Sequence, residues 1–353
     1  MLIRRIKDNT QITDFATEAD FLLAASVTYT CNIPKITQAG IEGMIPLTPT
    51  LDAELITKGT VCSLPQLAST PKGVPTPALL TRTAQVLKPF SSMKILDLGL
   101  QSRPKNCEVI DFEISPSNSI ASHAQINSRC IFFKGVDAAK NYTPKSGTLI
   151  LGESTPSGTT TANATIKALG FNSDGMFASS FKDAPTSVKE KHIAQALSHI
   201  DNSMSSFEKL SAVADNMLIF CAGFILEATQ HYRVILAGGT QMAAVLLTAQ
   251  KLALELKIGF KSANISLCTT AWVVEDENSN ILGLLNQLST PVESYYADFH
   301  FTHANISVLK SYDDGEAKEG VGAGAAIAYL FANGFSEQEI TNSVETIMGS
   351  MLS

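Results

Sequence analysis

The sequence predicts an α/β protein whose mostly parallel sheet is flanked by helices. Short apolar runs that end in glycine are repeatedly followed by longer, helix-compatible runs, and this order is typical of βαβ units. Hydrophobic residues make up 45% of the 353-residue chain and charged residues only 17%. That composition suits a large buried core and argues against disorder.

The first half of the chain indicates two strands and one helix. Residues 21–29 are apolar and β-compatible, and residues 93–100 form an apolar run that ends in a Gly-Leu pair. Residues 78–87 have the pattern of a helix. Residues 31–60 are expected to be irregular. They contain a series of structure-breaking residues, namely Pro34, Gly40, Gly43, Pro46 and Pro49.

The second half alternates between strands and helices. Strands are predicted at residues 148–151, 233–237, 264–274 and 294–301. Helices are predicted at residues 160–169, 188–200, 207–214, 217–230, 240–256, 278–288, 325–331 and 336–351. Asp215 stands before one of these helices and is a residue type that caps helix N-termini.

This alternation predicts a Rossmann-like three-layer domain over residues 94–310. Residues 1–93 and 311–353 are expected to form a smaller, mainly helical domain. The net charge of −7, with no cluster of Lys and Arg, argues against a nucleic-acid partner. The six cysteines are scattered, and the N-terminus lacks an apolar signal segment, so we expect a cytoplasmic protein with reduced thiols and no membrane partner.

The loop at residues 152–161 has the pattern of a phosphate site. An apolar run ends at Glu153, and a loop rich in glycine and hydroxyl side chains then opens a helix. Free N–H groups and the helix dipole favour an anion at such a helix start, and hydroxyls add donors. Glu153 would repel the anion, so it is a candidate for chemistry instead. The predicted phosphate-binding residues are Ser157, Gly158, Thr159 and Thr160.

A second glycine-rich segment, residues 317–329, contains Glu319 followed by Gly320. Glu319 is either a solvated acid in the first turn of a closely packed helix or a general base that a loop presents to a cleft. Gly238 and Gly239 follow a predicted strand. They form either a further phosphate or ribose contact or a tight turn between strand and helix.

No group of His, Cys and acidic residues has the sequence spacing of metal ligands, so no metal is expected. His300 and His303 stand at a strand end, where they would face opposite sides. The phosphate-binding loop of nucleotide triphosphatases, the hydrolase nucleophile elbow and the dinucleotide fingerprint are all missing from the sequence. No cofactor is expected either.

Taken together, these segments resemble the nicotinate-nucleotide–dimethylbenzimidazole phosphoribosyltransferase family. Residues 152–162 resemble the family's G-E-x-x-x-x-[NG]-T-T-T-A loop, and residues 319–323 resemble its E-G-[TS]-G-A loop. Thr302-His303 resembles its Ser-His pair after a late strand, and Lys189 corresponds to a family lysine. The likeness covers residues 148–330.

The first half resembles a divergent branch of this family, known largely from archaea and cyanobacteria, through residues 73–82 and 97–100. Three features depart from the well-studied bacterial branch. The N-terminal Lys-Pro-Pro-Gly-[SA]-Leu-Gly motif is missing, Ser154-Thr-Pro-Ser157 replaces Met-Gly-Ile-Gly, and Ala237-Gly238-Gly239 replaces Asp-Gly-Phe. The missing motif helps to shape the acceptor end of the family's site.

The resemblance implies phosphoribosyl transfer from nicotinate mononucleotide to an aromatic base such as 5,6-dimethylbenzimidazole. The products would be nicotinate and the α-riboside 5′-phosphate of the cobamide lower ligand. It also implies a homodimer, with Glu319 as general base and Glu153 beside the ribose or acceptor. Further implied substrate contacts are Gly238, Gly239, Thr302, His303, Gly320 and Lys189. Three alternatives are open: a non-catalytic nucleotide-binding or sensing protein, a transferase with another acceptor, and an enzyme that uses phosphoribosyl pyrophosphate.

Overall fold

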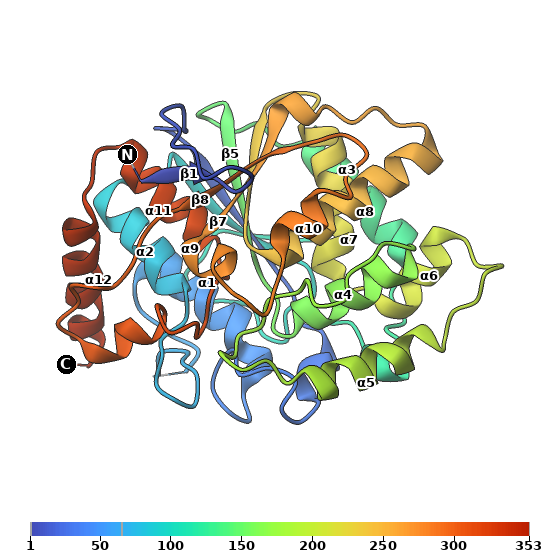
Figure 1. Cartoon of the computed structure of the whole chain (residues 1–353), viewed down its shortest axis with the longest axis horizontal. Coiled ribbons are helices and arrows are strands. Elements are labelled where there is room, and N and C mark those ends of the chain that lie inside the picture. The colour runs from blue at the N-terminus through green and yellow to red at the C-terminus, as the bar shows by residue number, and fades with distance from the viewer. Residues whose placement is uncertain (1, 65, 353) are drawn as a thin grey trace.

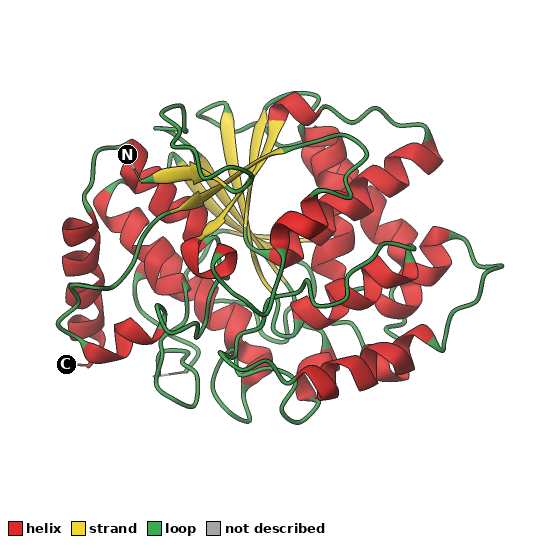
Figure 2. Ribbon diagram, in the orientation of Figure 1, coloured by secondary structure: helices red, strands yellow, loops and turns green. Residues whose placement is uncertain are grey.

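One eight-stranded sheet lies between two layers of helices in the computed structural model, which describes residues 2–64 and 66–352 (Figures 1 and 2). The strand order is β1-β8-β7-β6-β5-β2-β3-β4. The strands are β1 (Ile3–Arg5), β2 (Asp20–Ala25), β3 (Ser92–Asp97), β4 (Val109–Asp111), β5 (Thr148–Ser154), β6 (Arg233–Ala237), β7 (Ile265–Thr270) and β8 (Glu293–Ala297). Only the β1–β8 pairing among them is antiparallel. The predicted α/β class with a mostly parallel, helix-flanked sheet is confirmed.

Helices from the two ends of the chain cover one face of the sheet, on the left in Figure 1. They are α1 (Thr48–Lys58), α2 (Ala78–Leu87), α11 (Ala323–Ala332) and α12 (Glu337–Leu352). The first and last segments therefore pack together, as expected for the smaller helical part. However, β1 and β2 are hydrogen-bonded into the main sheet. The division into two domains stays a prediction.

The helices of the middle segment cover the other face, on the right in Figure 1. They are α3 (Ser128–Lys140), α4 (Gly158–Ala168), α5 (Thr186–Leu197), α6 (Ser206–Val213), α7 (Asn216–Ala228), α8 (Thr240–Leu256) and α10 (Ile281–Leu285). Helix α7 is almost entirely buried, and the predicted cap at Asp215 is confirmed because its Oδ1 accepts from Leu218 N–H at 2.9 Å. No helix in the described part of the chain has the length and apolar character needed to cross a membrane.

Short elements complete the chain. The 3₁₀ helices are η1 (Tyr29–Asn32), η2 (Ile45–Leu47), η3 (Ile120–Ser122), η4 (Ser262–Asn264) and η5 (Ser307–Ser311). The strand predicted at residues 264–274 divides into β7 and a short helix, α9 (Ala271–Val274). Helix α3 and strands β1 and β4 were not predicted at all.

The expectation of irregular structure throughout residues 31–60 is wrong, because α1 lies within it. Pro49 lies in the first turn of that helix, where its missing N–H has no intrahelical partner to lose. Gly59, at φ +74°, ends the helix in the left-handed conformation that glycine adopts readily. Both residues therefore mark helix ends.

Helix α11 packs directly on the backbone of β7, and Gly324 permits this contact. A Cβ atom at Gly324 would lie 2.0 Å from the carbonyl carbon of Thr269. The close packing brings the segment before α11 against the carboxyl end of β7. The alanine- and glycine-rich sequence is therefore an adaptation to helix–sheet contact.

We predict that Gly324→Ala lowers the free energy of unfolding by about 3 kcal/mol, because backbone atoms must move to admit the methyl group. The matched control is Gly349→Ala in α12, where an added Cβ would meet no atom within 4 Å. That substitution should raise stability by about 0.5–1 kcal/mol through helix propensity. Urea denaturation measures both, and equal effects would contradict the packing argument.

Candidate active site

A pocket opens at the carboxyl ends of the central strands, where ligands bind in open parallel sheets. Loops after β5, β6 and β7, the segment before α11 and two loops of the first half all contribute to it. Most of the predicted site residues lie here. Those that line the pocket are Glu153, Ser157, Gly158, Thr159, Lys189, Gly239, Glu319 and Gly320.

A backbone hydrogen bond joins the two loops that carry the predicted catalytic carboxylates. Val321 N–H donates to the carbonyl oxygen of Glu153 at 2.8 Å. Val321 has φ +55°, an unfavourable conformation for a β-branched residue. Its own carbonyl accepts from the Thr81 hydroxyl at 2.8 Å, so bonds on both sides of the residue hold this conformation.

The Glu319 carboxylate accepts four hydrogen bonds. Gly320 N–H and Gly324 N–H donate to Oε1, each at 3.2 Å. The Thr269 hydroxyl and Thr270 N–H donate to Oε2, each at 2.9 Å. Burial raises the pKa of Glu319 to about 7, and the four donors oppose that rise. Glu319 is therefore partly ionised near neutral pH, as a general base requires.

Glu153, at the end of β5, is only 3% exposed, and its carboxyl group accepts fewer hydrogen bonds than that of Glu319. Gln241 Nε2 donates to its Oε1 at 3.3 Å. Burial, followed by the charge of Glu319, raises the pKa of Glu153 to about 8. Ionisation of Glu319 thus favours the protonated form of Glu153.

Asp52 of α1 is a third pocket carboxylate that the sequence did not suggest. Its oxygens accept from the hydroxyls of Thr76 at 2.7 Å and Ser154 at 2.8 Å. Burial raises the pKa of Asp52 to about 6. Since both oxygens are engaged, Asp52 fixes Ser154 and the loop of Thr76 in place. It lay within the segment that was predicted to be irregular.

The residues predicted to form a phosphate cradle lie at the start of α4. Ser157 adopts φ +67° at the cap position, and Thr160 N–H donates to its carbonyl at 2.9 Å. Among the described residues, the Ser157 and Thr160 hydroxyl oxygens are buried without a hydrogen-bond partner. A Cβ at Gly158 would lie 1.7 Å from Gln241 Oε1, so any larger residue there would displace the Gln241 side chain.

Lys189 brings a positive charge to this cradle. Its Nζ donates to the Thr159 hydroxyl at 3.4 Å and the Ser179 hydroxyl at 3.1 Å. Burial, together with the positive charge of Lys318, lowers the pKa of Lys189 to about 8. An incoming phosphate would favour the charged form. The combination of ammonium, hydroxyls and helix start suits a phosphate monoester.

Lys318 is a second buried cation that the sequence analysis missed, although it directly precedes Glu319. Its Nζ donates to the carbonyls of Ser179 at 3.2 Å and Phe181 at 2.8 Å, and it pairs with Asp276 at 3.5 Å. Burial lowers its pKa. These partners show that Lys318 anchors the 179–181 loop to the loop of Glu319.

Four predicted substrate contacts lie outside the pocket lining. Thr160 is fully buried behind the cradle. Gly238 is in a tight turn, where a Cβ would lie 2.8 Å from Met242 Cγ. Thr302 and His303 are exposed on the loop after β8, and the structure does not bring them to the pocket. The neighbouring Phe301 faces inward, and this turns residues 302–303 outward.

Comparisons with known proteins agree with this architecture. A family model described as phosphoribosyltransferase matches residues 114–262, which include Glu153 and the cradle but not Glu319. The solved structure of nicotinate-nucleotide–dimethylbenzimidazole phosphoribosyltransferase from Thermus thermophilus matches with a TM-score of 0.59 at 15% identity. The match covers 93% of this chain and 83% of that one. At this identity, the likeness shows a shared fold.

Archaeal relatives match over almost the whole chain. The UPF0284 protein of Sulfolobus acidocaldarius is 32% identical over 94% of this chain and 95% of its own length. The UPF0284 protein of Methanocaldococcus jannaschii is 33% identical over 91% of this chain and 90% of its own length. The predicted resemblance to a divergent phosphoribosyltransferase branch is confirmed. The chain belongs to the UPF0284 protein family.

Proposed function

We propose that this protein transfers a 5-phosphoribosyl group from nicotinate mononucleotide to an aromatic nitrogen base of the dimethylbenzimidazole kind. The products are nicotinate and the α-riboside 5′-phosphate of the base. One observation supports this above all: two carboxyl groups with raised pKa values share a pocket with a lysine-and-hydroxyl anion cradle. Binding of an anion alone would need neither carboxyl group.

The cradle binds the 5′-phosphate of the donor. Lys189 and the Thr159 hydroxyl face it, and the unpartnered Ser157 hydroxyl supplies a further donor. The phosphate takes no part in bond making, so its binding energy can orient the ribose between the carboxyl groups.

In the transfer step, the bond between C1′ and the pyridinium nitrogen breaks, and nicotinate leaves with the electron pair. One ring nitrogen of the acceptor forms the new bond to C1′ with its lone pair. The proton on the other ring nitrogen passes to Glu319. To accept it, Glu319 gives up one of its four hydrogen bonds, and the two of 3.2 Å are the weaker.

Glu153 lies beside the ribose in this proposal. The cationic donor favours the ionised form of this carboxyl group and lowers its pKa. Ionised Glu153 then stabilises the positive charge that develops at C1′. Gln241, which donates to it, orients the carboxylate.

The acceptor end is formed by the first half of the chain. Ile36, Val74 and Pro75 supply apolar surface to the pocket, which suits a planar aromatic ring. These loops belong to the divergent part of the sequence, so the acceptor can differ from dimethylbenzimidazole while the donor chemistry is kept.

We further propose a homodimer, which light scattering tests.

The proposal is tested by incubating the protein with nicotinate mononucleotide and a panel of benzimidazoles, purines and phenols. Mass spectrometry of the products should show nicotinate and one riboside phosphate. If nicotinate is released but none of the benzimidazoles, purines and phenols is preferred, the true acceptor belongs to another chemical class. Donor binding without turnover on any acceptor would favour a non-catalytic nucleotide sensor and contradict the proposal.

We predict that Glu319→Gln lowers kcat by about 10²–10⁴-fold, the usual contribution of a general base, while the donor dissociation constant changes by less than about threefold. In the unsubstituted protein, kcat/KM should rise as the pH approaches 7, because the base must be ionised, and should fall above about pH 8, where Lys189 loses its charge. Glu337→Gln, outside the pocket, is the control. Since all four partners of Glu319 are donors, thermal melting must show that the variant is folded. A parallel loss of binding would show that the assigned role is wrong.

We predict that Lys189→Ala weakens binding of nicotinate mononucleotide by about 10–100-fold, the value of a charge-assisted hydrogen bond. Binding of nicotinate riboside, which lacks the phosphate, should not change. Lys191→Ala, an exposed lysine on the same helix, is the matched control. Calorimetry measures the binding of both ligands to the unsubstituted protein and to the two variants. An equal loss of affinity for both ligands in Lys189→Ala would exclude contact between Lys189 and the phosphate.

We predict that Glu153→Gln lowers activity but raises stability at alkaline pH. The pKa of Glu153 is raised from 4.5 to about 8, so the free-energy cost of ionising it is absent below pH 4.5 and grows as the pH rises to about 8. At pH 9 the variant should be more stable by roughly 2 kcal/mol, and at pH 4 the two proteins should be equal. Urea denaturation at both pH values checks this, with exposed Glu190→Gln as control. A gain that is the same at both pH values would rule out relief of a buried charge.

A further inference from the structure

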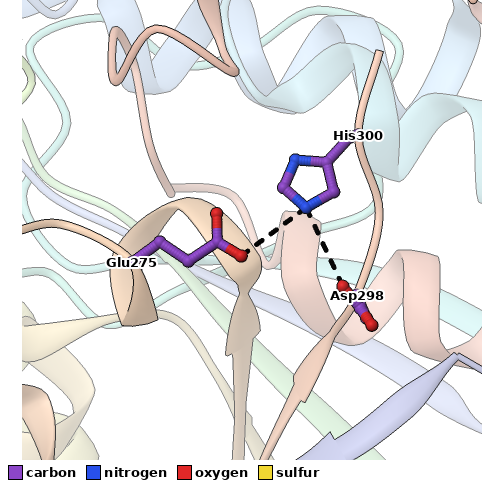
Figure 3. A group of neighbouring side chains, drawn as sticks. All are labelled: Glu275, Asp298 and His300. Atoms are coloured by element: carbon purple, nitrogen blue, oxygen red, sulfur yellow. Dashed lines mark ion pairs between the residues drawn. The ribbon is translucent and has the colours of Figure 1, made fainter. Parts of the chain in front are cut away.

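We propose that Glu275, Asp298 and His300 bind one divalent transition-metal ion, for which Zn²⁺ is the best fit. None of these residues lines the pocket of the proposed transferase site. Figure 3 shows the imidazole of His300 directed at the carboxylates of the other two. Glu275 directly follows helix α9, and Asp298 and His300 follow β8.

The spacing of the three ligand atoms suits a small ion. His300 Nε2 lies 3.6 Å from Glu275 Oε1 and 3.8 Å from Asp298 Oδ1. All three ligand atoms lie within 4.8 Å of one another. A tetrahedral ion with bonds of about 2.0–2.1 Å separates its ligands by about 3.3–3.4 Å. Movements of about 1 Å or less per atom would therefore bring the three atoms to coordination distance.

A carboxylate outside the triad holds the imidazole in the orientation for coordination. Asp313 Oδ1 lies 3.3 Å from His300 Nδ1. The same oxygen accepts from the Trp272 indole N–H at 2.9 Å and from Phe301 N–H at 3.2 Å. A carboxylate behind the second ring nitrogen is the usual support of a metal-binding histidine. With Nδ1 engaged in this way, Nε2 is the coordinating atom.

Asp298 is oriented in a similar way. Arg4 Nε donates to its Oδ2 at 2.6 Å, and this leaves Oδ1 facing His300. Three carboxylates, those of Glu275, Asp298 and Asp313, thus surround one imidazole, and Arg4 pairs with only one of them. A divalent cation would balance this excess of negative charge.

The donor set selects the type of metal. One imidazole nitrogen and two carboxylate oxygens suit Zn²⁺ and neighbouring transition ions, whereas Mg²⁺ and Ca²⁺ prefer oxygen ligands alone. The Glu275 side chain is 55% exposed, so the ion can enter from solvent. Three protein ligands leave the fourth position for water.

The site could not be found from sequence spacing. Glu275 is separated by 23 residues from Asp298, and the strand order brings β7 and β8 side by side. An ion would tie the end of α9 to the chain after β8. Asp276, next to Glu275, pairs with Lys318, so the fixed segment also contacts the loop of Glu319.

The test uses untagged protein that has been stripped with a chelator and then titrated with Zn²⁺ alone by calorimetry. We expect one ion per chain and a rise in Tm. Co²⁺ should give the visible absorption of a tetrahedral site. His300→Ala should weaken binding at least tenfold, and Asp313→Asn by about 10–100-fold. His303→Ala, an exposed histidine of the same loop, should bind as the unsubstituted protein does.

Glu275→Gln guards against a folding artefact, because among the described residues His300 is the only ion-pair partner of this carboxylate. Its Tm without metal should be unchanged, and its response to Zn²⁺ should be lost. The proposal is overturned if the unsubstituted protein binds no Zn²⁺ in 1:1 ratio, or if His300→Ala and His303→Ala bind it equally. None of these measurements depends on the transferase activity, so failure here leaves the proposed function untouched.

Discussion

The hydrogen bond from Val321 N–H to the carbonyl of Glu153 sets the geometry on which the pocket depends. It joins the end of a central strand to the segment before α11, 168 positions further along the chain. Such close contact requires small residues on both sides. A Cβ at Gly152 would lie 2.9 Å from the Phe21 ring, and one at Gly322 would lie 3.1 Å from Ala237 Cβ. The strained Val321 backbone is the local cost of placing Glu153 and Glu319 in one pocket.

Burial of charge determines the chemistry of that pocket. Desolvation raises the pKa values of Glu153, Glu319 and Asp52 and lowers that of Lys189. The pocket is therefore less charged than its composition suggests, which keeps the desolvation penalty small. A bound phosphate would raise the pKa of Lys189 again, and a cationic sugar would lower the pKa values of the carboxyl groups. Each charge on the ligand favours an opposite charge on the protein. The unpartnered hydroxyl of Ser157, which lines the pocket, is consistent with a site that is completed by its ligand.

The sheet order explains why distant segments share one site. Strand β5 lies between β2 and β6, so its loop contacts segments from both halves of the chain. The cradle and Glu153 lie within the family-model match at residues 114–262. The first-half loops complete the opposite wall. Donor and acceptor ends of the proposed site are thus formed by parts of the chain that can diverge independently.

The sequence alone determined the sheet class, strand β6, helix α2 and the two glycine-rich loops. Glycine marks strand ends and close contacts through purely local sterics, so these features are visible without tertiary information. Helix α1 was missed because Pro46 and Pro49 signal a break inside a helix but not at its start. Only the tertiary structure decided that Glu319 both opens a closely packed helix and faces a pocket. It also brought Lys318, Gln241, Asp52 and the His300 cluster to their partners and moved Thr302 and His303 away. These contacts join residues far apart in sequence, such as Gln241 and Glu153 at a separation of 88, and only strand order brings them together.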